Sequence, residues 1–429
     1  MKHSGIPWIG EIPKDWITKK LKFSCKLFGR IGFRGYTADD LVSESEGAIT
    51  LSPTNMNGIN LDFTKCSYLS WDKYYESPEI MVKKGDVLLV KTASVGKCSY
   101  VDYLPKETTV NPQILVMKEH RDVSKFIAYI FQTSLGEAYI DTTKGGSTIY
   151  TISQEKIGNY EFPFPPLPEQ QKIASFLDEK CSEIDEMVVL QEKIIEELKA
   201  YKQSVITEAV TKGIRNEELG MRNYKDSGIE WIGEIPESWT TIRIKYLLGE
   251  RKERSVHGYE EPLSMSQKYG LIPTKEMDMI PNMASSFEGA KIVYPEDLVF
   301  NKLKAHLGVF ATSKYNGLVS PDYAVYFGLG RALMPFMEYM FKTPQYISEF
   351  RKTATGVGSG LTRLYTSDLF SMPFPLPSIE EQVEIVSYIK QKCVDIDSLI
   401  QTKQSKIESL KEYKKSIIYE YVTGKKEVI

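Results

Sequence analysis

The chain of 429 residues carries the same pair of segments twice, and this duplication constrains its fold more than any other feature. Residues 4–16 read SGIPWIGEIPKDW and residues 227–239 read SGIEWIGEIPESW, so ten of thirteen positions are identical. From residue 169 onward the sequence matches residue 381 onward at a constant offset of 212. A period this long is typical of a duplicated pair of domains. The sequence therefore predicts an A–B–A′–B′ order, in which the A segments diverge and the B segments stay alike.

The two B segments have the composition of long helices. Each runs without proline or glycine for more than 40 residues, over 169–210 and 380–423. The second begins with Ser378-Ile-Glu-Glu381, a capping box that fixes a helix N-terminus. At 1.5 Å per residue, 42 residues would give a helix of roughly 63 Å. A helix of that length needs a partner of similar length, and the duplicate supplies one.

Apolar residues in both B segments recur at alternating steps of three and four, which is the pattern of a coiled-coil seam. Polar residues interrupt the two stripes at matched places, 191/403 and 202/414, where buried polar groups can set register. The alternative is that each helix packs only on its own domain. We predict an antiparallel helix pair with these interface residues: Ile184, Val188, Ile195, Leu198, Val205, Ile396, Ile400, Ile407, Leu410 and Ile417.

The A segments alternate short apolar runs with Gly, Pro, Asn and Ser, which indicates mixed, strand-rich domains. Residues 79–91 and 292–304 have the pattern strand, turn, strand, and short helices are expected at 123–140 and 333–350. The predicted class is α+β, with two strand-rich domains alternating with two long helices. The expected boundaries are 1–164 and 227–375 for the domains, 165–213 and 376–424 for the helices, 214–226 for a linker and 425–429 for a tail.

No motif of a catalytic site is complete. The P-loop pattern fails at Gly96-Lys97, because Cys98 follows instead of Ser or Thr. The four histidines are unclustered and the five cysteines are scattered, so we expect neither a metal site nor a disulfide framework. No apolar run approaches the length of a membrane span. We interpret the chain as a non-catalytic, cytoplasmic protein with reduced thiols, no membrane association and no cofactor of its own.

Two loops in each A segment have the composition of nucleic-acid contacts. One is rich in glycine and hydroxyl groups, over 143–151 and 355–366, and the other is basic, over 29–36 and 251–259. The net charge of −3 and the lack of a basic arm mean that any such contact is local. Each loop could instead be an ordinary polar surface loop. Lys91, Lys302 and Lys304 come just after the two strand–turn–strand segments, where they could contact DNA or simply be solvated strand ends. The candidate DNA-binding residues are Arg30, Arg34, Lys91, Lys144, Ser147, Thr148, Tyr150, Arg251, Arg254, Lys302, Lys304, Thr362, Arg363 and Tyr365.

Taken together, the sequence resembles the DNA specificity subunit of type I restriction-modification systems. The resemblance rests on the twin W-I-G-E-I-P segments, on the tandem layout, and on the helix entries Pro-Leu-Pro-Glu-Gln-Gln and Pro-Leu-Pro-Ser-Ile-Glu-Glu-Gln. It implies two target recognition domains, each reading half of a split site in double-stranded DNA, and two spacer helices that pair antiparallel. It also implies two modification (methyltransferase) subunits as partners, which carry S-adenosylmethionine. Restriction subunits can join and bring ATP and Mg chemistry.

Two other classes of function stay open on the sequence alone. The chain could be a scaffold for protein partners that never touches DNA, with the A segments diverging to suit two clients. It could also be a nuclease or methyltransferase, although the missing motifs argue against that. Divergent domains on a repeated spacer favour a bipartite reader, since base contacts specify a site and phosphate contacts position it.

Overall fold

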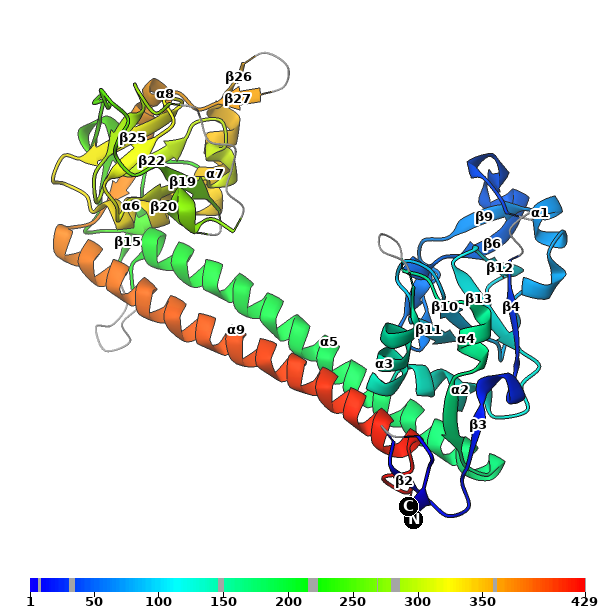
Figure 1. The fold of residues 1–429 in the computed structure, drawn as a ribbon. Coiled ribbons are helices and arrows are strands. Elements are labelled where there is room, and N and C mark those ends of the chain that lie inside the picture. The colour runs from blue at the N-terminus through cyan, green and yellow to red at the C-terminus, as the bar shows by residue number, and fades with distance from the viewer. Residues whose placement is uncertain are drawn as a thin grey trace. The chain divides into compact units, whose positions relative to one another are not determined.

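The computed structural model describes residues 1–6, 9–30, 35–145, 150–214, 223–267, 269–278, 286–357 and 361–428. The chain divides into two compact units, Met1–Glu192 with Gln404–Ile429, and Lys193–Lys403. Each unit holds one strand-rich α+β domain and parts of two long helices (Figure 1). The predicted fold class is confirmed. Among the described residues, no helix has both the length and the apolar composition needed to cross a membrane.

The long helices are α5 (Leu167–Lys212) and α9 (Ile379–Val422). Their ends lie within three residues of the predicted ones, because a proline stands just before each helix (Pro166, Pro377) and a glycine just after it (Gly213, Gly424). At the start of α9 the Ser378 hydroxyl accepts a hydrogen bond from Glu381 N (3.2 Å), as the capping-box sequence predicts.

The domain of the first unit is built on an antiparallel sheet with the strand order β11 (Cys98–Tyr100), β10 (Val87–Val90), β13 (Ile114–Lys118), β4 (Lys26–Gly29). Successive residues of β10 face opposite sides of the sheet, and both sides are buried. Val87 and Leu89 pack into the core that contains α2 (Ser124–Phe131), whereas Leu88 and Val90 pack against the second sheet. This explains why β10 reads as a continuous apolar run.

The second sheet of this domain has the order β12 (Thr108–Val110), β6 (Gly47–Leu51), β9 (Ser67–Ser70), β5 (Leu41–Val42). Short two-stranded ladders join β1 (Lys2–His3) to β2 (Glu11–Ile12) and β7 (Met56–Asn57) to β8 (Asn60–Leu61). A further ladder pairs β3 (Ile17–Lys20) with β14 (Glu161–Phe164), which leads directly into α5. The remaining helices are α1 (Trp71–Tyr75), α3 (Ser134–Thr143) and α4 (Gln154–Gly158).

The domain of the second unit repeats the central sheet as β18 (Leu248–Glu250), β25 (Tyr323–Gly328), β22 (Leu298–Asn301), β23 (Phe310–Thr312). Strand β17 (Thr240–Arg243) pairs with β28 (Pro373–Leu376), which leads into α9. The other ladders join β15 (Tyr224–Asp226) to β16 (Glu234–Pro236), β19 (Leu263–Ser266) to β20 (Gly270–Pro273), β21 (Lys291–Val293) to β24 (Gly317–Val319), and β26 (Thr355–Val357) to β27 (Leu361–Arg363). The helices are α6 (Met334–Phe341), α7 (Pro344–Thr353) and α8 (Thr366–Ser371).

Two sequence predictions need correction. Residues 78–80 form a 3-10 turn where the first strand of the 79–91 segment was expected. Each helix predicted at 123–140 and 333–350 is two helices, α2 with α3 and α6 with α7. The cause is a buried threonine, Thr133 or Thr343, whose hydroxyl caps the second helix of each pair.

The twin W-I-G-E-I-P segments hold the far ends of the long helices. In the first unit Lys425, just beyond α9, donates from Nζ to the backbone oxygens of Ile9 (2.8 Å) and Glu11 (2.6 Å). In the second unit Lys212, at the end of α5, donates to Glu234 O. The first unit therefore joins the beginning of the chain to its end, and Figure 1 shows the two termini side by side.

The long helices run antiparallel within each unit. In the first unit the rings of Phe176 and Tyr421 lie 4.5 Å apart, and Asp185 bonds Lys414, so residue numbers rise on α5 as they fall on α9. The ten seam residues named above are all buried or half-buried. The buried ones are Ile184, Ile195, Val205, Ile396, Ile407, Leu410 and Ile417, and the half-buried ones are Val188, Leu198 and Ile400.

A test of the seam uses Ile184→Asp and, separately, its duplicate Ile396→Asp, since these side chains are only 5% and 3% exposed. Loss of the buried side chain alone costs about 2–5 kcal/mol, and an unpaired buried charge adds to that. We expect each variant to lower the free energy of unfolding by at least this amount in denaturant titration. Glu192→Gln, at an exposed position of α5, is the control, with a change below about 0.5 kcal/mol. Equal stability of variants and control would contradict a buried seam.

Candidate functional site

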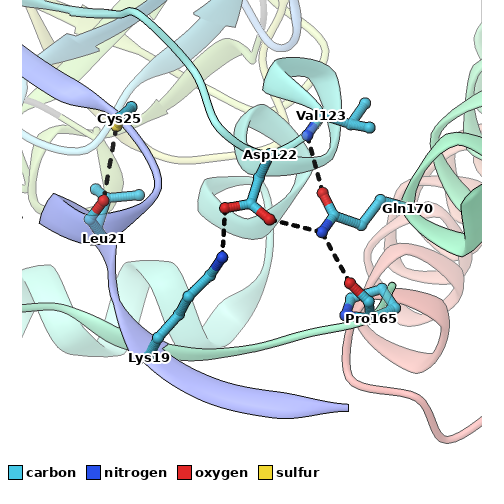
Figure 2. Close-up of polar contacts among 7 residues, drawn as sticks. All are labelled: Lys19, Leu21, Cys25, Asp122, Val123, Pro165 and Gln170. Atoms are coloured by element: carbon cyan, nitrogen blue, oxygen red, sulfur yellow. Dashed lines mark hydrogen bonds and ion pairs between the residues drawn. The ribbon is translucent and has the colours of Figure 1, made fainter. Parts of the chain in front are cut away.

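A buried glutamine fastens the start of α5 to the domain beside it. Gln170 is 1% exposed, and its amide oxygen accepts a hydrogen bond from Val123 N (2.9 Å). Its amide nitrogen donates to Pro165 O and to Asp122 Oδ1, both at 2.8 Å (Figure 2). Asp122 also accepts from Lys19 Nζ at 2.6 Å. One neutral side chain therefore joins the helix entry to the start of α2 and, through Asp122, to strand β3.

Gln382 makes the same connection at the start of α9. It is fully buried, and its amide oxygen accepts a hydrogen bond from Leu333 N (2.7 Å), next to α6. Its amide nitrogen donates to Pro377 O (3.0 Å) and to Arg331 O (3.3 Å). The two glutamines are 212 residues apart, and they are the residues that make the repeated Glu-Gln helix entry recognisable. We call this arrangement the glutamine clip.

The residues around the glutamine clip differ between the two units, but in each unit they suit one another. Where the first unit has the ion pair of Lys19 and Asp122, the second has Ile242 and Ala332, which belong to its apolar core. Near the first clip the Cys25 thiol donates to Leu21 O (3.8 Å) (Figure 2). Burial, with a smaller contribution from Asp122, raises the pKa of Cys25 to about 12, so the thiol is uncharged. The clip is therefore the constant part and its neighbours are the variable part.

Two duplicate ion pairs explain one of the polar interruptions in the seam. In the second unit Lys202 Nζ lies 2.7 Å from Asp397 Oδ2, and in the first unit Lys414 Nζ lies 2.6 Å from Asp185 Oδ2. Both members of one pair are offset by 212 from those of the other. All four side chains are partly exposed, so each pair adds little stability. Their effect is on the direction and register in which α5 and α9 can pair.

In the first unit, Lys91 lies where the glycine-rich loop meets the end of β10. Ile152 N donates to Lys91 O (2.9 Å), and Ala93 N donates to Tyr150 O (2.9 Å). Burial lowers the pKa of Lys91, and no carboxylate of the described residues lies within 4 Å of its ammonium group. A half-buried cation without an anion is a natural point of contact for a phosphate.

The other loop candidates of the first unit have partners within the protein or lie outside the described residues. Lys144 Nζ lies 2.6 Å from Asp141 Oδ1 and 4.5 Å from the centre of the half-exposed Tyr150 ring. A DNA phosphate would therefore compete with Asp141 for Lys144. The remaining predicted contacts, Arg34, Ser147 and Thr148, lie outside the described residues.

The first arginines of the two basic loops occupy matched places, just after β4 and β18. Arg30 is buried, and its guanidinium donates to Thr109 Oγ1 and Val110 O, both at 3.4 Å. Arg251 makes a bidentate ion pair with the buried Asp297, in which Nε donates to Oδ2 (2.8 Å) and Nη2 donates to Oδ1 (2.9 Å). Each arginine thus has a structural role, and contact of either with DNA stays a prediction.

In the second unit the hairpin β26–β27 brings Arg363 to the end of β22. Leu364 N donates to Lys302 O (3.0 Å), which is the same contact that Ile152 makes with Lys91 in the first unit. Arg363 bonds the exposed Asp322 at 3.0 Å. The two units therefore place one lysine, Lys91 or Lys302, at an equivalent position against the loop.

The remaining candidates of the second unit lie at the surface or just below it. Arg254 is exposed and donates to Gly289 O (2.7 Å). Lys304 and Tyr365 are exposed, and Thr362 is half-buried in β27. The geometry brings Lys302 and Arg363 to one place. Contact of any of these residues with DNA stays a prediction.

Two further residues were not singled out by sequence reasoning. Lys291, the first residue of β21, is almost fully buried, with its ammonium 3.7 Å from Glu250 Oε1. No sequence signal could place it, because its neighbours come from distant segments. Tyr259 is 88% exposed and stacks on His257 at 5.5 Å, at the tip of the basic loop. An aromatic residue beside Gly258 in a polar loop is a signal that could have been used.

A comparison with protein families finds the type I restriction modification DNA specificity domain over residues 13–200. The EcoKI specificity subunit of Escherichia coli K12 is 22% identical over 406 residues, covering 91% of this chain and 84% of the relative. The MjaVIII specificity subunit of Methanocaldococcus jannaschii is 22% identical over 374 residues, covering 82% and 81%.

Two solved structures have the same fold. A chain from work on complex assembly and conformational transition of the type I R-M system gives a TM-score of 0.69 at 14% identity, covering 96% of this chain and 98% of that one. The HsdS subunit of Thermoanaerobacter tengcongensis gives 0.56 at 14% identity, with the same coverage. Among the described residues, no group of three His, Cys, Asp or Glu could hold a metal ion.

The glutamine clip is tested by Gln170→Leu and Gln170→Glu. Leucine leaves Val123 N and Asp122 without their buried partner, which costs about 1–3 kcal/mol for each group. Glutamate puts a carboxylate beside Asp122 and Pro165 O, and this raises the pKa of the introduced acid. The variant protein therefore takes up a proton when it folds. Its stability deficit should therefore shrink as pH falls. Thermal unfolding across pH checks this against the exposed neighbour Gln171→Glu, for which we expect no such recovery. A pH-independent deficit would contradict the proposed contacts.

Proposed function

We propose that the chain is a type I restriction-modification DNA specificity subunit, which reads a bipartite, asymmetric DNA site and directs modification subunits to it. The DNA specificity domain matched over residues 13–200 and the similarity to specificity subunits along most of the chain support this. The chain recognises DNA sequence and is not itself a catalyst. In this proposal residues 1–164 and 227–375 are the target recognition domains, and residues 165–213 and 376–424 are the spacer. Each domain reads one half of the site, and the helices fix how the halves are presented.

The observation that carries the proposal is which contacts repeat and which do not. The glutamine clip and the Lys–Asp pairs of the helices recur at an offset of 212. The loop residues do not recur, since Thr151 stands where the second copy has Arg363. A constant frame with variable loops suits a reader of two different half-sites. A scaffold for protein clients is not favoured, because the family recognises DNA.

We also propose that the helices bind two modification subunits through a repeated apolar surface. Met187 and its duplicate Leu399 are each 50% exposed, and Tyr201 and its duplicate Tyr413 are 55% and 56% exposed. Large apolar side chains at matched exposed positions are typical of protein contacts. Two equivalent surfaces suit two copies of one partner, which would carry S-adenosylmethionine. Restriction subunits would add ATP and Mg chemistry, and the five free cysteines suit a cytoplasmic setting.

Independent reading of the half-sites is tested by domain exchange. Replacing residues 1–164 with the corresponding domain of a relative should change one half of the methylated sequence and leave the other half as it was. The contacts of the glutamine clip lie within one unit, so the other domain should be undisturbed. Genome-wide mapping of methylated bases in cells that express the hybrid checks this. A change in both halves would contradict independent reading.

The partner surface is tested by the double variant Met187→Glu, Leu399→Glu. Both side chains point to solvent, so folding should change by less than about 0.5 kcal/mol, while capture of modification subunits should fall at least tenfold. Co-purification and sedimentation of the mixed subunits measure this. The matched control is Glu196→Ala, Glu408→Ala, another exposed duplicate pair on the same helices. Normal assembly of the Met187/Leu399 variant would place the partner elsewhere.

A further inference from the structure

We propose that Lys302, Arg363 and Lys291 form a binding site for one backbone phosphate of DNA, a contact that positions the second half-site without reading its bases. The inference rests on the proposed function and deepens it. We call these three residues, together with Arg254, the cation cluster. It lies wholly within the second unit.

Separate segments of the chain supply the cation cluster. Lys302 follows strand β22, and Arg363 ends strand β27, whose next residue bonds Lys302 O at 3.0 Å. Lys291 begins strand β21 and forms a backbone bridge with Arg254. Backbone contacts therefore hold the cluster as two pairs, Lys302 with Arg363 and Lys291 with Arg254. The charges of Lys291 and Arg363 both act on Lys302, so the two pairs lie near each other in the folded domain.

The charges of the cluster do not balance. Glu250 Oε1 lies 3.7 Å from Lys291 Nζ, and Asp322 Oδ1 lies 3.0 Å from Arg363, so two carboxylates face four cations. Among the described residues, no carboxylate lies within 4 Å of the Lys302 ammonium. Burial lowers the pKa of Lys302, and the neighbouring Lys291 and Arg363 lower it further. Burial and the charge of Arg254 act on Lys291 in the same direction, against Glu250. An anion at this place would relieve the repulsion.

The donors of the cluster suit the oxygens of a phosphate. Arg363 supplies a planar guanidinium, and its buried Nε has no hydrogen-bond partner among the described residues. Guanidinium and ammonium groups together are typical of phosphate contacts. A guanine edge would need the guanidinium to project freely into a groove, whereas Asp322 already holds it from one side.

The first unit supports a role that does not depend on the base sequence. Its equivalent lysine, Lys91, receives the same backbone bond from the loop, through Ile152 N. The positions of Lys291, Arg363 and Glu250 are there Ile80, Thr151 and Gly29. Gly29 stands where the second unit has Glu250, so the first unit has no acid at this place. A side chain there would begin 3.2 Å from the Lys91 ammonium. The central lysine is thus kept while its neighbours change, as expected of a contact to the common backbone.

The experiment uses the chain assembled with modification subunits, and measures binding to a DNA duplex bearing the recognised site from 0.05 to 0.4 M salt. A second duplex has an altered second half-site. Lys302→Gln should weaken binding to both duplexes alike, by about eightfold at 0.1 M salt, and lower the salt slope by about one unit. Asp322→Asn should tighten binding to both, because it releases Arg363, and a folding defect could not produce that change. Lys314→Gln, an exposed lysine in the same unit, is the control.

Loss of discrimination at one base position in Lys302→Gln, with an unchanged salt slope, would overturn the phosphate assignment in favour of base reading. If both Lys302→Gln and Asp322→Asn keep the wild-type affinity and the wild-type salt slope, the cation cluster does not contact DNA. If the wild-type complex binds both duplexes equally, the proposed sequence reading fails. The salt dependence of the variants would still decide the phosphate contact.

Discussion

One buried amide fastens the start of each long helix to the strand-rich domain beside it. A helix start leaves backbone groups unpaired, and here the entry is also packed against a second helix start, so both donors and acceptors need partners. Gln170 and Gln382 meet this need because an amide donates and accepts at once. A carboxylate could not donate to the proline carbonyl, and an ammonium could not accept from the backbone N–H. This explains why the Glu-Gln entry is kept while its surroundings exchange an ion pair for apolar residues.

The Lys–Asp pairs of the long helices act on direction more than on stability. Each helix carries one aspartate and one lysine at duplicate positions, 185 and 202 on α5 and 397 and 414 on α9. Antiparallel pairing sets each lysine opposite an aspartate, as observed. Parallel pairing in register would bring like charges together, which costs energy and removes both attractions. A sequence repeat of this kind therefore specifies the antiparallel state, although each exposed pair contributes little stability.

Helices and strands could be predicted from the sequence where a single local pattern determines them. The ends of α5 and α9 follow from proline and glycine, and β21 and β22 follow from short apolar runs on either side of the turn at Pro295. Prediction failed where tertiary contacts override local pattern, as at the 3-10 turn of residues 78–80 and at the buried caps Thr133 and Thr343. The site was harder still. Arg30 sits in a basic loop yet is buried, and Lys291 comes near Lys302 only in the folded domain, from a separate strand, which no linear motif records.

Several cations of the candidate DNA-binding loops are already paired with carboxylates of the same domain. Lys144 faces Asp141, Arg251 faces Asp297 and Arg363 faces Asp322. A DNA phosphate gains less from a cation that already faces a carboxylate than from one that does not, because counterion release depends on unneutralised charge. Among the described candidates, Lys91, Lys302, Lys304 and Arg254 have no carboxylate within 4 Å. The candidates without an acid are therefore those from which a phosphate contact would gain most. Discrimination between sites can then rest with the loops, since a subunit that bound all DNA tightly would lose its selectivity.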